Sequence, residues 1–110
     1  MEPRAAARLE PKSIVFKALA HPSRLFIVEE LAKGKRCVCE LTAMIGADTS
    51  TVSKHLTILK NAGIIRDQKR GAQVYYELLM PCVLSFFGCI DKVIAERAEW
   101  QLEVTRETVS

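Results

Sequence analysis

Apolar side chains recur every three or four residues in the first third of the chain, the spacing of an amphipathic helix. Residues 1–10 show no such spacing, so we expect a frayed start. Pro11 can open a first helix, and Pro22 suits the first position of a second helix that ends at Gly34. The apolar sides of these two helices would comprise Ile14, Val15, Ala18 and Leu19, then Leu25, Val28, Leu31 and Ala32.

The same periodicity continues through two more segments that lie only a few residues apart. Apolar positions from Val38 predict a short helix that ends at Gly46. A polar residue among positions 48–50 can cap a fourth helix, which Gly63 would close. The inward side of this fourth helix would consist of Val52, Leu56 and Leu59. A short helix, a tight turn and a helix with a polar face together predict a helix-turn-helix.

Two extended segments follow the fourth helix. Residues 64–68 and 73–78 predict strands on either side of a tip formed by Lys69, Arg70 and Gly71. A hairpin with a basic tip directly after a helix-turn-helix is a wing. The predicted fold class is therefore mostly α with a β-hairpin wing: a winged helix-turn-helix of about five helices and two strands.

The last predicted helix opens at Pro81 and is apolar over nearly half of its surface. Its apolar residues are Val83, Phe86, Phe87, Ile90, Val93 and Ile94. One small domain cannot bury so much apolar surface, so we expect a second copy of the chain to cover it.

Length and composition limit the class of protein. The chain has 110 residues, of which 49% are apolar and 26% charged, and we expect a single globular domain over residues 1–110. No apolar run approaches the roughly 20 residues of a membrane span, and the start does not resemble a signal peptide. We therefore expect a cytoplasmic protein with no membrane partner. The net charge of +3 permits binding to a polyanion without requiring it.

The polar side of the fourth helix carries the residue types that contact DNA. In a helix-turn-helix the second helix enters the major groove, where hydroxyl and amide groups meet base edges and cations meet phosphates. The candidates on this helix are Thr49, Ser50, Thr51, Ser53, Lys54 and His55, and Lys60, Lys69, Arg70, Gln73 and Tyr75 extend the expected contact. A solvated helix face is the alternative, but the neighbouring hairpin favours DNA. A two-fold dimer would place two such helices about 34 Å apart, so the expected partner is operator DNA with an imperfect palindrome. His21 is expected to cap or pack.

Two of the four cysteines, Cys37 and Cys39, lie one residue apart at the predicted start of the third helix. In a reducing compartment such thiols serve as soft-metal ligands, redox sensors or small buried residues more often than as structural disulfides. Residues two apart in a regular helix point about 200° away from each other. Cys37 must therefore lie at or before the helix cap, or the first turn must distort when both sulfurs hold one ion. Glu40 can reach back toward that cap.

The other two cysteines, Cys82 and Cys89, are too far apart, at about 10 Å along the last helix, to share one ion with each other. Either can complete a three-sulfur site with the first pair, and we favour Cys89 slightly; the alternative is that both pack at an interface. A thiol oxidoreductase is not expected, because Cys-x-x-Cys beside a strand-helix-strand pattern is absent. We therefore predict a protein that is not an enzyme and has no organic cofactor.

Four quoted segments, "LAHPSRLFIVEEL", "CVCEL", "TSTVSKHLTILKNAGII" and "GAQVYYEL", resemble the ArsR/SmtB family of small winged-helix repressors in the family's order. The similarity covers roughly residues 16–79. It implies a homodimeric, operator-binding repressor that dimerises through its first and last helices and leaves DNA on binding an inducer. In this family Cys-Val-Cys is typical of the branches that bind arsenite or antimonite, or soft cations such as cadmium and lead.

The resemblance is incomplete at the ion-binding residues. The arsenic pattern has a third cysteine where this chain has Thr42, so the third ligand must come from elsewhere or the inducer differs. The family's zinc or cobalt site needs histidines on the last helix, which has none. We expect arsenite or antimonite as inducer, bound by Cys37, Cys39 and either Cys89 or Cys82. A cadmium or lead sensor is one alternative. Another is a repressor that responds to oxidants or reactive sulfur by bridging Cys37 or Cys39 to a last-helix cysteine.

Overall fold

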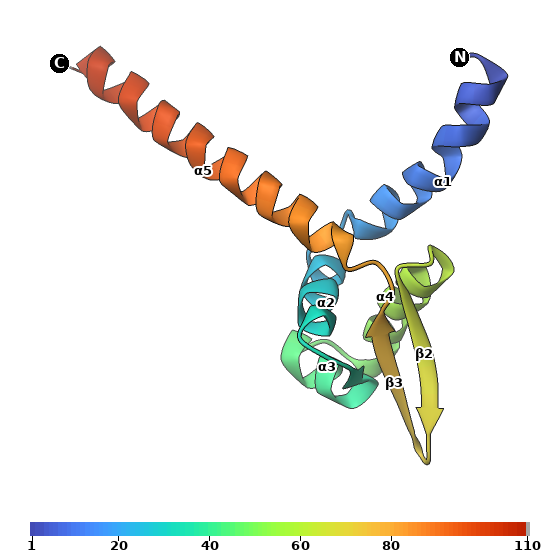
Figure 1. Cartoon of the computed structure of the whole chain (residues 1–110). Helices are drawn as coiled ribbons and strands as arrows, with labels where there is room; N and C mark the ends of the chain where they lie inside the picture. The colour runs from blue at the N-terminus through green and yellow to red at the C-terminus, as the bar shows by residue number, and fades with distance from the viewer. Residues whose placement is uncertain (110) are drawn as a thin grey trace. The chain divides into compact units, whose positions relative to one another are not determined.

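The structure is a computed structural model that describes residues 1–109, in two compact units. The first unit runs from Met1 to Met80, and the second begins at Pro81. The first contains α1 (Pro3–Leu19), α2 (Pro22–Ala32), β1 (Arg36–Cys37), α3 (Val38–Ile45), α4 (Thr49–Asn61), β2 (Ile65–Arg70) and β3 (Gln73–Leu78), and the second contains α5 (Cys82–Val109). Figure 1 shows the β2–β3 hairpin extending away from the helices of the first unit. The predicted winged helix-turn-helix is confirmed.

The helices of the helix-turn-helix begin and end at side chains suited to those positions. Gly46 ends α3 in the left-handed conformation, with φ +76° and its N–H donating to the Thr42 carbonyl at 3.0 Å. Only glycine adopts this conformation without steric cost. Asp48 then caps α4, where its carboxylate accepts from the Thr51 N–H at 2.7 Å. The two caps lie two residues apart and fix the tight turn between α3 and α4.

The wing sheet has three strands, one more than the sequence predicted. Its order is β1-β3-β2 and both pairings are antiparallel. The two residues of β1 pair with β3, Arg36 opposite Tyr76 and Cys37 opposite Tyr75. A strand this short has no alternating pattern, so the periodicity could not reveal it. The third strand joins the wing to the segment that leads directly into α3.

The core of the first unit consists of one apolar side from each helix and the start of the wing. Val52, Leu56 and Leu59 of α4 are at most 1% exposed, which confirms the predicted inward side. Other fully buried side chains are Ile27, Val28, Leu41, Ile64 and Ile65. Burial of a side chain of this size stabilises the fold by roughly 1.5–3 kcal/mol. Because the inward side fixes the rotation of α4, its opposite, polar side faces solvent.

The first helix starts earlier than predicted, at Pro3 rather than Pro11, so the expectation of a frayed start was wrong. The Glu2 side chain caps α1 by accepting from the Arg4 N–H at 3.1 Å. Residues 5–7 are alanine, the strongest helix former, and continue the helix. Pro11 lies inside α1 at an exposed position, where water can bond to the carbonyl that loses its amide partner.

The second unit is formed by the long helix α5. Ile90, Val93 and Ile94 follow each other at helical spacing and are 40–60% exposed. These residues form the apolar stripe that the sequence predicted for a dimer interface. Within residues 1–109, no helix combines the length and the apolar character needed to cross a lipid bilayer.

Candidate thiol site and DNA interface

Cys37 ends strand β1 and is the N-cap residue of α3. Its backbone is extended, with φ −80° and ψ 162°, and its Sγ accepts from the Glu40 N–H at 3.4 Å. The Glu40 carboxylate in turn accepts from the Cys37 N–H at 3.2 Å. The two bonds form a capping box in which sulfur takes the place of the usual serine or threonine oxygen. The expected backward reach of Glu40 is confirmed. Cys37 lies at the cap, which was one of the two arrangements that the sequence allowed.

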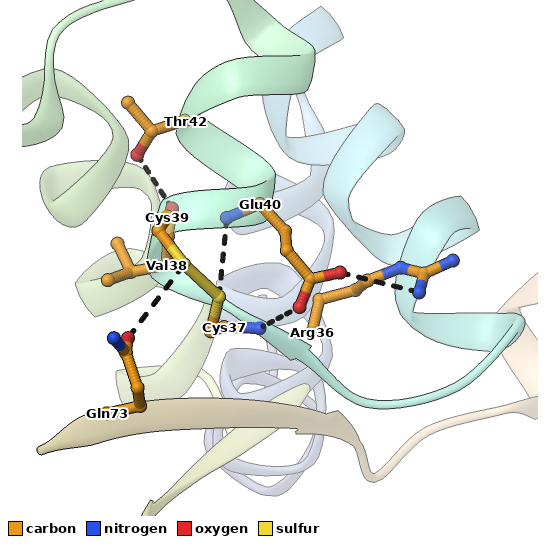
Figure 2. The surroundings of a disulfide bond; sticks show 7 residues. All are labelled: Arg36, Cys37, Val38, Cys39, Glu40, Thr42 and Gln73. Carbon is orange, nitrogen blue, oxygen red and sulfur yellow. Dashed lines mark hydrogen bonds and ion pairs between the residues drawn. A yellow bond between two sulfur atoms is a disulfide. The ribbon is translucent and has the colours of Figure 1, made fainter.

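The sulfurs of Cys37 and Cys39 meet at this cap, where they form a disulfide (Figure 2). The Cα atoms are 5.4 Å apart. The sequence left two arrangements open, with Cys37 at or before the cap or with a distorted first turn. The structure has the first, because Cys37 has an extended backbone outside the helix. The thiol pair therefore brings two sulfurs together while α3 stays regular from Val38 to Ile45.

The two sulfurs differ in their access to solvent. Cys37 is 4% exposed, whereas Cys39 is an exposed residue. The Cys39 Sγ lies 3.8 Å from the Gln73 Oε1, at the start of β3 (Figure 2). An incoming molecule would reach Cys39 first, and Cys39 also contacts a wing strand.

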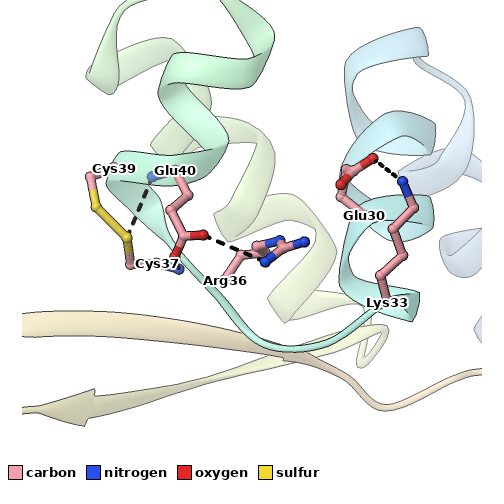
Figure 3. Close-up of polar contacts among 6 residues, drawn as sticks. All are labelled: Glu30, Lys33, Arg36, Cys37, Cys39 and Glu40. Carbon is pink, nitrogen blue, oxygen red and sulfur yellow. Dashed lines mark hydrogen bonds and ion pairs between the residues drawn. A yellow bond between two sulfur atoms is a disulfide. The ribbon is translucent and has the colours of Figure 1, made fainter.

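The basic residues beside the thiol pair are already matched by carboxylates. Arg36 lies 3.6 Å from the Glu40 carboxylate, separate from the Lys33–Glu30 pair on α2 (Figure 3). Lys35 pairs with Glu77 of β3 at 3.2 Å. The hydrogen bond from Lys35 is the largest influence on the pKa of Glu77 and lowers it; burial opposes this effect, and a hydrogen bond from Arg66 lowers the pKa further. These pairs tie the segment before α3 to the wing sheet.

The remaining cysteines, Cys82 and Cys89, both lie on α5 in the second unit. Each is exposed and is outside any disulfide. The disulfide joins Cys37 to Cys39. The oxidative alternative had instead assumed a bridge from one of these two to a cysteine of α5. Within residues 1–109, no three cysteine, histidine or acidic side chains are grouped closely enough to hold a metal ion. The choice of Cys89 or Cys82 as third sulfur stays a prediction.

The outward side of α4 presents the predicted polar residues, and one of them, Ser50, also takes part in the helix cap. Thr49, Thr51, Ser53 and Lys54 are exposed. The Ser50 hydroxyl donates to the Asp48 carboxylate at 2.7 Å and so contributes to the cap. The Thr51 N–H and the Ser50 hydroxyl lower the pKa of Asp48 to about 2, so the cap stays ionised at neutral pH. All these residues lie at the start of α4, the end that contacts bases in this motif.

The candidate residues near the wing are partly engaged with each other. Lys60 at the end of α4 pairs with Asp67 of β2 at 3.0 Å, which offsets its charge. Arg70 lies over the Tyr75 ring, 6.0 Å from its centre, and Tyr75 is half-buried. Lys69 is exposed near the tip. Among the wing residues, Lys69 and Arg70 are thus the cations available for contact with phosphate.

His55 of α4 packs against His21, the N-cap of α2, with ring centroids 4.4 Å apart. The Nδ1 of His21 accepts from the Ser23 N–H at 3.1 Å, which confirms the expected capping role. The Nδ1 of His55 is buried and has no hydrogen-bond partner among residues 1–109. His55 therefore packs against a residue of another helix, and its contact with DNA stays a prediction. Sequence reasoning missed the contact because the two histidines lie 34 positions apart in the chain.

The His21–His55 contact predicts a loss of stability in mild acid. Burial, and then the charges of His21 and Arg24, lower the pKa of His55 below 6.5. Below pH 6.5 the unfolded chain binds a proton that the folded chain resists, so unfolding becomes more favourable as pH falls. Urea denaturation of the wild type and of His55→Gln between pH 7.5 and 5.5 measures this. The wild type should lose more stability over that interval, and parallel curves for the two proteins would contradict the prediction.

The comparisons with known proteins agree with this architecture. Residues 21–67 match the family model described as "Bacterial regulatory protein, arsR family". A cadmium resistance regulator homologue of Staphylococcus aureus is 45% identical over 65 residues, which cover 58% of this chain and 54% of that protein. An arsenical resistance operon repressor of Bacillus subtilis is 45% identical over 64 residues, which cover 57% of this chain and 61% of that protein. The matches thus span little more than half of these two regulators.

A solved structure matches over a longer stretch. A homodimeric winged helix-turn-helix DNA-binding domain from Mycobacterium bovis, described as a possible ArsR-family regulator, superposes with a TM-score of 0.76. It is 32% identical to this chain and the match covers 90% of this chain and 92% of that domain. The similar proteins are DNA-binding transcriptional regulators rather than enzymes.

Proposed function

This chain belongs to the arsR family of bacterial regulatory proteins, and on that basis we propose that it is a transcriptional repressor released from its operator by a soft ion. Trivalent arsenic, as arsenite, is the first candidate inducer, and antimonite the second. Cys37 and Cys39 are the proposed ligands. The observation that carries the proposal is that their two sulfurs meet at the cap of the helix that precedes the recognition helix α4.

The proposed DNA complex uses two copies of the chain. The apolar stripe on α5 supports dimerisation, together with α1, and the M. bovis neighbour is described as homodimeric. Each α4 would present Thr49, Thr51, Ser53 and Lys54 to the major groove, while the wing tip meets the backbone. The two helices would contact half-sites about 34 Å apart in an imperfect palindrome. We place this activity in the cytoplasm, where a bacterial regulator meets its operator.

Lys54 is expected to contact phosphate rather than bases. Replacing it with alanine should weaken binding to operator and non-operator DNA alike and reduce the salt dependence by about one counterion per Lys54, thus about two per dimer. Titrations of labelled DNA by fluorescence anisotropy at several salt concentrations measure the slope. Lys12→Ala removes the same charge from α1 and should leave the slope unchanged. An unchanged slope in Lys54→Ala would place Lys54 outside the interface.

Thiolates select soft ions, and in the reduced form Cys37 and Cys39 would supply two thiolates side by side at the cap of α3. Trivalent arsenic favours three sulfurs, so the proposed site takes its third from α5, with Cys89 preferred over Cys82. The names of the S. aureus and B. subtilis relatives support either cadmium or arsenic chemistry. Cadmium and lead therefore remain the alternative inducers.

Coupling to DNA would follow from the position of Cys37 in two elements at once. Its Sγ accepts the Glu40 N–H, and its backbone pairs with Tyr75 of the wing. When Cys37 acts as a ligand, its sulfur would be drawn toward the ion and away from the Glu40 N–H, which would weaken the cap of α3. Because α3 leads through a tight turn into α4, the change would reach the recognition helix. Coupling of this kind is typically about 1–3 kcal/mol, or roughly five- to 150-fold in DNA affinity.

The experiment that tests the function is a titration of the reduced dimer on operator DNA with arsenite, antimonite, cadmium and lead. A phosphine reductant is suitable because it has no thiol to compete for the ion. The proposal expects arsenite to lower DNA affinity by roughly fivefold or more. Parallel titrations of Cys82→Ser and Cys89→Ser identify the third sulfur, because only the variant that lacks it loses the response. No release by any of the four ions would refute the proposed function.

The disulfide between Cys37 and Cys39 favours a second candidate, in which oxidation is itself the signal. In that case oxidised protein should leave DNA with no ion present. Measuring DNA affinity before and after oxidation separates the two candidates.

A further inference from the structure

The disulfide uses both sulfurs of the thiol pair and is compatible with an ordered cap and wing around it. With Cys37 and Cys39 joined, the Glu40 N–H donates to the Cys37 sulfur and the Cys37 N–H donates to Glu40. Strand β1 pairs with β3, and Leu41 in the first turns of α3 is fully buried. The bridged state thus has a capped start of α3 and a paired wing sheet, the two elements beside the recognition helix α4.

We propose that Cys37 and Cys39 form a reversible oxidation site that makes the repressor insensitive to its inducer while it stays on DNA. The inference rests on the proposed function, since it concerns the same sulfurs. A thiolate holds a soft ion, whereas a disulfide sulfur has lost the charge and has become a poor ligand. The bridged protein therefore continues to repress in the presence of the ion.

The site is suited to oxidation by a low-molecular-weight disulfide, RSSR. The Cys39 thiolate, which is exposed, attacks one sulfur of RSSR and forms a mixed disulfide, and one RS⁻ leaves. The Cys37 thiolate then attacks the Cys39 sulfur, forming the Cys37–Cys39 bond and expelling the second RS⁻. The two protein thiols lose two electrons and two protons, and RSSR gains them to become two RSH.

The geometry of the two cysteines decides which of them reacts first with RSSR. The Cα atoms of the two cysteines are 5.4 Å apart, inside the range that a disulfide needs without backbone movement. Cys37 is nearly buried and so is protected from RSSR itself, yet it lies within reach of Cys39. Cys39 is thus the residue that reacts first, and Cys37 is the one that resolves the mixed disulfide.

The experiment compares reduced and oxidised full-length dimer on the same operator DNA. Oxidised glutathione is the probe, and peptide mapping by mass spectrometry identifies the bridged residues. The oxidised protein should bind DNA within about threefold of the reduced protein, and arsenite should then change its affinity by less than about twofold, against fivefold or more when reduced. Removing glutathione and adding the phosphine should restore the response. The same peptide map should recover Cys82 and Cys89 of the oxidised wild type as free thiols, which excludes a bridge to α5.

Three results would overturn the inference alone while the reduced protein still responds to arsenite. The oxidised protein could leave DNA without ion, which would make oxidation the inducing signal. It could still be released by arsenite, or mapping could find Cys37 and Cys39 unbridged after treatment. If the reduced protein itself ignores arsenite and the other ions, the proposed function fails and the inference fails with it.

Discussion

Cys39→Ser should abolish release of the reduced repressor by arsenite and leave DNA affinity without the ion within about twofold of the wild type. Serine keeps the size of the side chain but replaces the soft sulfur with a hard oxygen, which does not bind a soft ion. Cys39 is exposed, and its sulfur approaches the Gln73 side chain at 3.8 Å. The cap of α3 depends on Cys37 instead and is untouched. Fluorescence anisotropy of labelled operator, with and without arsenite, measures both quantities.

A matched control is Ala43→Ser, which adds a hydroxyl to another exposed position of α3. This variant should respond to arsenite like the wild type. If Cys39→Ser is still released at wild-type arsenite concentrations, the ion is held without the thiol pair. Loss of DNA binding by Cys39→Ser before any ion is added would instead give Cys39 a structural role.

Leu56→Ala is expected to lower the free energy of unfolding by about 2–5 kcal/mol. Leu56 is 1% exposed, on the inward side of α4, and its truncation would leave a cavity in the small core of the first unit. Urea denaturation at one fixed protein concentration measures the change, because a dimer's stability depends on concentration. At low temperature, where the variant remains folded, DNA affinity should change far less than stability.

The control for this variant lies on the same helix. Thr57 is the next residue and is exposed, and its hydroxyl donates to the Ser53 carbonyl of its own helix at 2.9 Å. Thr57→Ala should change stability by less than about 0.5 kcal/mol. Equal losses in the two variants would mean that the rotation of α4, and with it the assignment of its DNA-facing side, is wrong.

The sequence was most informative where local chemistry sets the fold. Gly46 and the capping group at Asp48 mark the ends of their helices through interactions that span four residues or fewer, so the helix-turn-helix was predictable. Apolar spacing likewise placed Leu56 and its neighbours inward. The wing followed from two extended segments and a glycine at the turn, where Gly71 has φ +62°.

The features that the sequence did not reveal depend on the tertiary arrangement or on a single backbone angle. Strand β1 exists only because Arg36 and Cys37 lie beside β3. The meeting of the two sulfurs depends on the extended conformation of Cys37, which helical periodicity cannot report. His55 has a face that suits DNA contact, but its packing on His21 requires the fold itself.

The edge strand β1 has a consequence for how such a regulator can change over time. Arg36 and Cys37 join the wing through main-chain pairing, which does not depend on the identity of their side chains. Side chains at these positions can therefore be exchanged while the backbone link to the DNA-binding elements persists. Natural variation could in this way replace one chemical stimulus with another and keep the same target promoter.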